Sequence, residues 1–296
     1  MPRTAPAKDP KQAGPKPPYS RKKQPAPGRE AEMTPQADHG EESYKPGSRL
    51  ADKVAIITGG DSGIGRAIAI AFAREGADIV LSYLKEEEED ACETAKWVEQ
   101  AGRKVVLAPG DIQKSRYCKD LAETAVNKLG HLDIVVNNAA FQRTYDDPQD
   151  IPEDEWERTF RTNIFGTFFL SQAALPHLDK GSSIINTASI QAFDPSPNLL
   201  AYAPTKAAIA NFTKALAKAV GSRGIRVNAV APGPVWTPLI PSTMPEEKVE
   251  KFGSDTAFQR AAQPAELAPL YVFLASDEAT YVTGEVYGAT GGQTPV

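Results

Sequence analysis

The chain has 296 residues with a formal net charge of −5, and 41% of its residues are hydrophobic. The negative charge gives no basis for binding nucleic acid or an anionic membrane surface, and no apolar run approaches the roughly 20 residues that span a bilayer. Two cysteines without a CxxC pair and three scattered histidines predict no metal site and are typical of a reducing compartment, so we expect a cytoplasmic protein.

Residues 1–48 differ in composition from the rest of the chain. They are rich in Pro, Lys, Gln and Glu and contain almost no aliphatic side chains. Such a segment cannot bury enough apolar surface to offset the entropy lost when it becomes ordered. We therefore expect residues 1–48 to form an extended N-terminal arm, either a free tail or a strap on a neighbouring subunit. Residues 49–296 are expected to form a single domain.

From Ala51 onward, short β-branched runs alternate with longer segments of helical periodicity. Most of these runs are apolar at consecutive positions, which is typical of strands covered on both faces. Regular alternation of strand and helix predicts an α/β fold, a Rossmann-type doubly wound parallel β-sheet. The predicted strands are 53–59, 78–83, 104–110, 132–139, 182–189, 225–233 and 285–292, and the predicted helices include 66–75, 87–100, 114–129 and 205–220.

A glycine-rich turn follows the first predicted strand. Thr58, Gly59, Gly63 and Gly65 form a T-G-x-x-x-G-I-G pattern where the strand ends and a helix begins. Ligands of open α/β sheets bind at the carboxyl ends of the strands. Glycines let the backbone approach a pyrophosphate, whose charge is favoured at a helix N-terminus. An ordinary turn is the alternative, but the position between strand and helix favours a dinucleotide site.

Tyr202 and Lys206 lie four residues apart, in a predicted helix that begins near Tyr202. This spacing places both side chains on one helix face. A nearby ammonium lowers the pKa of a phenol, ordinarily near 10, toward the pH at which acid–base catalysis is most effective. For the pair alone, a packed tyrosine beside a solvated lysine is the alternative. Pro204 is tolerated between them because it falls in the first helical turn.

Further motifs follow the glycine turn in a recognisable order. They are NNAA at 137–140, Asn163, Ser189, the Tyr202–Lys206 pair and PGPVWT at 232–237. Together they resemble the short-chain dehydrogenase/reductase family over about residues 51–292. The arm and the sequences TGGDSGIG and VTGEVYGATGG are similar to a subgroup of bacterial oxidoreductases related to glucose and ribitol dehydrogenases. The resemblance implies an NAD(P)-dependent enzyme that transfers a hydride between nicotinamide and a small alcohol or carbonyl substrate.

The resemblance also implies residue roles. Tyr202 would be the acid/base, and Lys206 would lower its pKa and bind the nicotinamide ribose. Ser189 would hydrogen-bond the substrate oxygen, and Asn163 would hold a water of the proton relay. The implied cofactor-binding residues are Gly59, Asp61, Ser62, Gly63, Ile64, Gly65, Tyr83, Asp111, Ile112, Asn138, Ala139, Tyr202, Lys206, Pro232, Gly233, Val235 and Thr237.

The end of the second predicted strand carries no standard signature for either nicotinamide cofactor. An acidic residue there would bind the 2′-hydroxyl of NAD, and an arginine would accommodate the phosphate of NADP. Tyr83 and Leu84 occupy these places instead. Asp61 and the acidic run 86–89 would repel a 2′-phosphate, and Lys85 is the only counterweight in this stretch. These charges favour NAD over NADP.

Candidates for the substrate side are Gln142, Gln191, Phe193 and Trp236, under a lid at 237–253. The two glutamines favour a sugar or polyol, with a small ketone or aldehyde as second choice. Two other functions stay open: a non-catalytic NAD(P)-binding redox sensor, and a stress-associated protein. The complete set of Ser189, Tyr202 and Lys206 argues against the sensor. The resemblance also implies a homotetramer, and small residues on the helix after Tyr202 (Ala207, Ala208 and Ala210) are compatible with it.

Overall fold

The computed structural model describes residues 10–12 and 14–293, and in them seven strands form one parallel sheet in the order β3-β2-β1-β4-β5-β6-β7. The chain runs outward from β1 to β3 and then returns to place β4 beside β1, which creates a topological switch point between these two strands. The predicted doubly wound α/β fold is confirmed. The strands are β1 Val54–Thr58, β2 Asp78–Tyr83, β3 Val105–Pro109, β4 Leu132–Asn137, β5 Leu178–Thr187, β6 Arg226–Pro232 and β7 Val286–Ala289.

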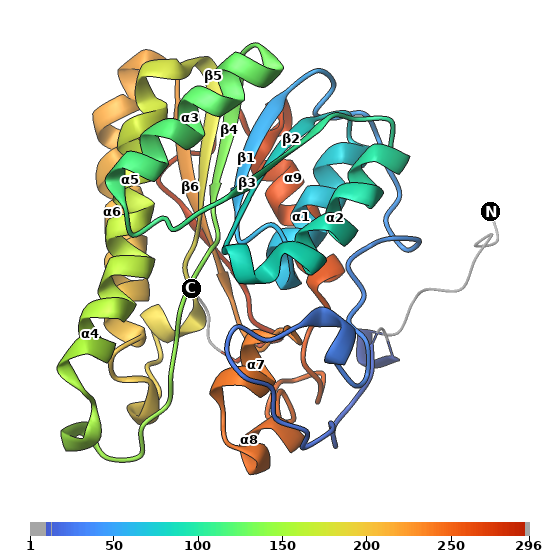
Figure 1. Ribbon diagram of the computed structural model, residues 1–296, viewed down its shortest axis with the longest axis vertical. Helices are drawn as coiled ribbons and strands as arrows, with labels where there is room; N and C mark the ends of the chain where they lie inside the picture. Colours follow the sequence, from blue (N-terminus) through green and yellow to red (C-terminus); the bar gives the residue numbers. More distant parts are fainter. Residues whose placement is uncertain (1–9, 13, 294–296) are drawn as a thin grey trace.

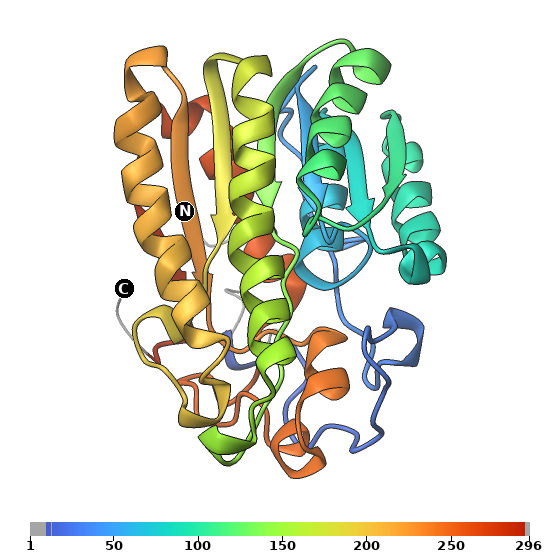
Figure 2. The ribbon, with the colours of Figure 1, turned by 60° about the vertical axis from the view of Figure 1, so that its left-hand side comes forward.

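Helices cover both faces of the sheet (Figures 1 and 2). On one face lie α1, α2 and α9, and on the other lie α3, α5 and α6. One π-helical turn, Arg161–Phe165, joins α4 to α5. The helices are α1 Gly63–Arg74, α2 Glu88–Gln100, α3 Ser115–Leu129, α4 Glu153–Phe160, α5 Gly166–Ala174, α6 Ala203–Val220, α7 Leu239–Thr243, α8 Glu246–Glu250 and α9 Pro264–Ala275.

The central strand β1 shows why apolar residues occur at consecutive positions. Ala55 and Ile57 belong to the core cluster that includes α1 and α9, whereas Val54 and Ile56 belong to the cluster that includes α3 and α5. Every residue of β1 is buried. Because side chains alternate between the two faces of a strand, a sheet covered by helices on both faces requires apolar residues at every position. The result is a rigid platform with its strand ends directed at one edge.

The N-terminal arm lies beside α7 and α8 at this edge (Figures 1 and 2). Tyr19 stacks on Trp236 with ring centroids 4.2 Å apart, and Met33 is buried in the same cluster as Ile240. The expectation of a free tail or a strap on a neighbouring subunit is therefore wrong for this part of the arm, which packs on its own domain. The composition of the arm does not reveal this packing, because a few buried side chains such as Tyr19 and Met33 hold a segment that has no hydrophobic core of its own. Residues 1–9 and 13 of the predicted arm lie outside the described residues.

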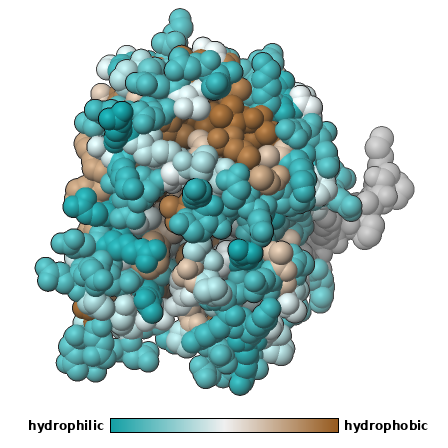
Figure 3. All heavy atoms as spheres, viewed as in Figure 1, coloured by the Kyte–Doolittle hydropathy of each residue, from teal (hydrophilic) through white to brown (hydrophobic). Residues whose placement is uncertain are grey.

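The face of the molecule in Figure 3 is largely hydrophilic, with hydrophobic atoms gathered mainly in its upper half. Among the described residues, no helix combines the length and the apolar character that crossing a bilayer requires.

Candidate active site

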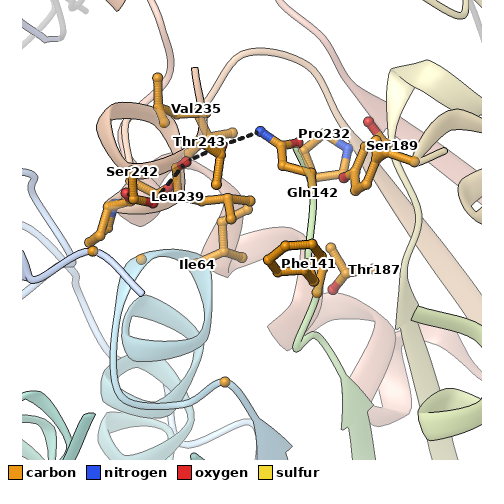
Figure 4. Close-up of a pocket in the computed structure, with 18 of the residues that line it drawn as sticks. Ile64, Phe141, Gln142, Thr187, Ser189, Pro232, Val235, Leu239, Ser242 and Thr243 are labelled. Carbon is orange, nitrogen blue, oxygen red and sulfur yellow. Dashed lines mark hydrogen bonds between the residues drawn. The ribbon is translucent and has the colours of Figure 1, made fainter. Parts of the chain in front are cut away.

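A cavity of about 780 Å³ opens at the carboxyl ends of the strands, next to the switch point between β1 and β4. The glycine turn after β1, the segment after β4, the start of α6 and the segment from β6 to α8 all contribute to its lining. In Figure 4, Phe141, Gln142, Thr187 and Ser189 lie on one side and Leu239, Ser242 and Thr243 on the other. Of the catalytic and cofactor-binding residues predicted from sequence, all but Gly65 and Asn163 line this cavity.

The glycine turn is held tightly against the end of β4. The hydroxyl oxygen of Thr58 accepts hydrogen bonds from the backbone N–H groups of Asn138 (2.9 Å) and Ala139 (3.0 Å). The Asn138 amide donates back to the carbonyl oxygen of Thr58 at 3.1 Å. Gly65 does not line the cavity. A Cβ at this position would lie 1.8 Å from the carbonyl oxygen of Gly59, so the packing inside the turn requires a glycine here.

Tyr202 and Lys206 are both buried where α6 begins. Tyr202 is the N-cap of α6, and the side chain of Lys206 is 1% exposed. The Lys206 Nζ lies 5.3 Å from the centroid of the Tyr202 ring and donates a hydrogen bond to the carbonyl oxygen of Thr187 at 2.8 Å. Ser189 lies at the end of β5, and its hydroxyl accepts a hydrogen bond from the Gln191 N–H at 3.2 Å. The structure thus brings Ser189, Tyr202 and Lys206 to one wall of the cavity.

The electrostatics of this pair differ from the sequence expectation. Burial raises the pKa of Tyr202 above its ordinary value, and a hydrogen bond with Ser189 opposes the rise. Burial lowers the pKa of Lys206 to about 7. Burial therefore moves the pKa of Tyr202 in the direction opposite to the expected one. Spacing places the two groups on one face, but both lose water, and desolvation favours the neutral form of each. Tyr202 keeps its proton at neutral pH.

Asn163 lies in the π-helical turn before α5, and both polar atoms of its side chain have protein partners. Its Oδ1 accepts the Phe141 N–H at 2.8 Å, and its Nδ2 donates to the Phe141 carbonyl oxygen at 2.9 Å and to the Thr205 hydroxyl at 3.0 Å. Both amide hydrogens are used, and Oδ1 keeps one lone pair that can accept a hydrogen bond from a water. These contacts hold the segment after β4 against α6.

Thr187, at the end of β5, is a site residue that sequence reasoning missed. Its carbonyl oxygen holds Lys206, and its hydroxyl lies 2.8 Å from the Tyr271 hydroxyl and 3.3 Å from Asn138 Oδ1. Thr187 therefore connects α6, α9 and the end of β4 beneath the cavity. Its position two residues before Ser189, at the end of a central strand, could have indicated from sequence that it lies at the site.

Only part of the predicted substrate side lines the cavity. Gln142 and Gln191 do, but both amides are engaged by the protein: Gln142 Nε2 donates to Thr243 Oγ1 at 3.1 Å (Figure 4), and Gln191 exchanges two hydrogen bonds with Ser196. The predictions for Phe193 and Trp236 are wrong. Phe193 points to solvent, and Trp236 is buried against Tyr19 of the arm. Lining residues missed from sequence include Phe141, Arg158 and Asn198, whereas Leu239 and Met244 belong to the predicted lid at 237–253.

Acidic groups gather at the end of the cavity next to β2. Asp61 is buried, and its Oδ1 has no hydrogen-bond partner in the described part of the chain. Glu87 lines the cavity beside it. Burial raises the pKa of both carboxyl groups, and repulsion by Asp61 adds to the rise at Glu87. The Tyr83 hydroxyl donates to Glu88 at 2.9 Å. The unpaired Oδ1 of Asp61 fits a ribose hydroxyl of a dinucleotide, and the tight glycine turn fits its pyrophosphate.

Comparison with known proteins agrees with this geometry. A family model described as enoyl-(acyl carrier protein) reductase matches residues 59–294. The structure of a short chain dehydrogenase from Burkholderia cenocepacia in complex with NADP superposes with a TM-score of 0.77 at 32% identity, over 82% of this chain and 98% of that one. The chain belongs to the short-chain dehydrogenase/reductase family. As a member of this family it is an oxidoreductase that uses a nicotinamide cofactor.

Three relatives are more similar in sequence, and a further solved structure is similar in fold. The uncharacterized oxidoreductase YghA of Escherichia coli is 52% identical over 93% of this chain and 94% of its own. The glucose and ribitol dehydrogenase of Daucus carota is 45% identical over 92% and 95%. The NADPH-dependent aldehyde reductase 1 of Arabidopsis thaliana is 45% identical over 90% and 94%. A 3-ketoacyl-(acyl-carrier-protein) reductase from Brucella melitensis, complexed with NADH, has a TM-score of 0.76 at 30% identity, over 83% and 100%.

Proposed function

We propose that this oxidoreductase interconverts a small hydroxylated carbonyl compound and its alcohol, with Tyr202 as the acid/base. The observation that carries the proposal is the buried Tyr202 phenol, whose pKa burial raises, beside the Ser189 hydroxyl on the wall of the cavity. A phenol that keeps its proton at neutral pH is a general acid, so the arrangement favours carbonyl reduction. Oxidation of the alcohol needs the phenolate and therefore a higher pH.

Each residue at this wall has a distinct part in the proposal. A nicotinamide held in the cavity would supply or take up the hydride. Tyr202 donates its proton to the substrate oxygen, and Ser189 hydrogen-bonds the same oxygen and orients it. Lys206, held by the Thr187 carbonyl oxygen, stabilises the phenolate that is left when Tyr202 has given up its proton. Asn163 has a positioning part, because its side chain fixes the backbone of Phe141 across the cavity.

The substrate proposal rests on the polar groups of the lining. Gln142, Asn198, Ser242 and Thr243 place amides and hydroxyls around the space in front of Ser189. These groups favour a sugar or polyol, with a small aldehyde or ketone as the second candidate. The names of the carrot and Arabidopsis relatives span the same two classes.

For the cofactor, we propose a preference for NAD over NADP. Asp61 at the β2 end of the cavity disfavours a 2′-phosphate by charge repulsion, because its raised pKa of about 6 leaves it largely ionised at neutral pH. Glu87, whose pKa is raised to about 8, adds to this repulsion only at higher pH. The relatives include both kinds of user, so the proposal depends on these two carboxyl groups. A fluorescence titration with NADH and with NADPH tests it. Tighter binding of NADPH would overturn the preference without affecting the assignment of Tyr202.

We propose a homotetramer that assembles through helices α5 and α6. Phe165, at the end of the π-helical turn, and Phe168 of α5 have exposures of 44% and 43%, and Phe168 contacts Phe212 of α6. An exposed aromatic cluster of this kind is typical of a protein–protein interface. We propose the cytoplasm as its location, where two free cysteines stay reduced.

Replacement of Tyr202 by Phe tests the catalytic assignment. We expect turnover with a panel of aldehydes, ketones and polyols to fall by about 100- to 10,000-fold, the usual contribution of a general acid. The affinity for NADH should stay unchanged. Tyr281→Phe is the matched control, since the Tyr281 side chain is fully exposed. Turnover retained by the Tyr202 variant would overturn the assignment.

A further inference from the structure

The N-terminal arm forms part of the wall of the cofactor cavity. Ala26, Pro27 and Gly28 line the cavity together with Asp61 and Ser62 of the glycine turn. A Cβ at Gly28 would lie 2.4 Å from the carbonyl oxygen of Pro238, so the arm packs closely on the segment before α7. The arm thus closes a side of the cavity that the sheet and its helices leave open.

Glu30 ties this wall to the glycine turn. Its side chain is 2% exposed, and its Oε1 accepts the backbone N–H of Gly63 at 2.6 Å. Gly63 is the first residue of α1, and its φ of +49° lies in the left-handed region. The first N–H groups of a helix have no partner inside the helix. A carboxylate at this position is stabilised by both the hydrogen bond and the helix dipole. The Gly63 N–H is therefore not a free donor for a phosphate.

Glu30 is itself held in place by charged groups of the arm and of α2. His39 Nε2 lies 3.0 Å from Glu30 Oε1, and His39 Nδ1 lies 3.2 Å from Glu41 Oε1. Burial alone would lower the pKa of His39, but hydrogen bonds and charge from these carboxylates raise it to about 9. The Glu30 N–H also donates to Asp90 Oδ2 at 3.2 Å. The carboxylate is thus ionised and oriented before any ligand binds.

The same network reaches the other end of the glycine turn. Asp90 pairs with Arg66 of α1 at 3.2 Å, and Arg66 Nε donates to the carbonyl oxygen of Asp61 at 2.9 Å. Glu30 therefore holds the turn directly at Gly63 and, through Asp90 and Arg66, at Asp61. Between these two points lies the backbone that faces the cavity.

We propose that Glu30 is a positioning residue of the cofactor site, and that docking of arm residues 26–30 and binding of the nicotinamide dinucleotide stabilise each other. The inference rests on the dinucleotide site, not on the substrate or on Tyr202. Loss of the Glu30 carboxylate frees the glycine turn and the arm wall, so cofactor affinity falls while the catalytic wall at Tyr202 stays intact. Reciprocity follows because two events that favour the same conformation must favour each other.

The test compares Glu30→Ala with Glu32→Ala. Glu32 lies on the same short turn of the arm, but its side chain is exposed and pairs only with Lys22. For Glu30→Ala we expect the Kd and KM for NADH to rise about tenfold or more, the usual effect of losing a hydrogen bond to a charged group. The kcat at saturating NADH should be unchanged. Glu30→Gln keeps an accepting oxygen and should recover part of the affinity. Glu32→Ala should match the wild type.

Two results would overturn the inference: a Kd of the Glu30 variant within about twofold of wild type, or a lower kcat with an unchanged KM. A wild-type protein that binds no NADH would instead overturn the dinucleotide site itself. Hydrogen exchange of the wild-type protein covers the case in which Glu30→Ala fails to fold. NADH should slow exchange in a peptide spanning residues 24–36 but not in one spanning α3. Equal exchange of residues 24–36 with and without NADH would contradict the coupling.

Discussion

Burial of the Lys206 amine, which we propose acts in catalysis, lowers the stability of the folded protein. Its side chain is 1% exposed, its Nζ donates to the Thr187 carbonyl oxygen, and burial lowers its pKa from 10.5 to about 7. We predict that Lys206→Met removes turnover and at the same time stabilises the fold. Methionine has a similar length and is apolar, so it fills the same space without needing water.

The magnitude follows from proton linkage. The unfolded chain binds the Lys206 proton below pH 10.5, and the folded protein binds it only below about pH 7. Between these values unfolding takes up a proton, so stability falls as the pH falls through this window. The cost is about 1.4 kcal/mol per pH unit, hence about 4 kcal/mol at pH 7 and about 2 kcal/mol at pH 9. Losing the hydrogen bond to Thr187 offsets about 1 kcal/mol. The net gain is therefore about 3 kcal/mol at pH 7 and about 1 kcal/mol at pH 9.

Urea unfolding of the variant and the wild type at these two pH values measures the difference, at one fixed protein concentration because the protein is expected to be oligomeric. Lys214→Met is the matched control, since Lys214 lies on the same helix α6 with an exposed side chain. A Lys206 variant that is less stable than wild type at pH 7 would refute the reasoning. So would a stability difference that does not change with pH.

Three further changes test other parts of the structure. The Glu30–His39 pair should stabilise the fold fully below pH 6.5, the ordinary pKa of histidine, and lose this effect as the pH rises through about 9. The urea midpoints of wild type and His39→Gln should therefore converge above pH 9. A difference in midpoint that does not change with pH would contradict the pairing. Gly65→Ala should lower NADH affinity more than about tenfold, because its Cβ meets the Gly59 carbonyl oxygen, whereas Gly221→Ala has open space and should bind NADH normally. Phe168→Glu should dissociate the proposed tetramer in light scattering at micromolar concentration, and Phe258→Glu, at an exposed phenylalanine outside α5 and α6, should not; a Phe168 variant that stays tetrameric would exclude this face.

Several features of this protein were accessible from sequence because local patterns determine them. The strand predicted at 78–83 is β2 with the same bounds, since its apolar residues are buried on both faces of the sheet. Tyr202 and Lys206 share a face because the helical repeat places residues four apart together. The strand, glycine turn and helix at Gly59–Gly65 form one continuous segment, so their order in the chain is also their order in space. Such features can be predicted from residues that are close together in the sequence.

Burial and long-range contacts were decided only by the tertiary structure. Spacing placed Lys206 beside Tyr202, but the direction of both pKa shifts depends on how much water remains around each group, and the packing of α6 against β5 determines that. Trp236 looked like a substrate contact, yet its partner is Tyr19, more than two hundred residues earlier. Glu30 and Gly63 carry no mutual signal in the sequence, because a hydrogen bond between an arm and a helix N-terminus forms only once the sheet has brought them together.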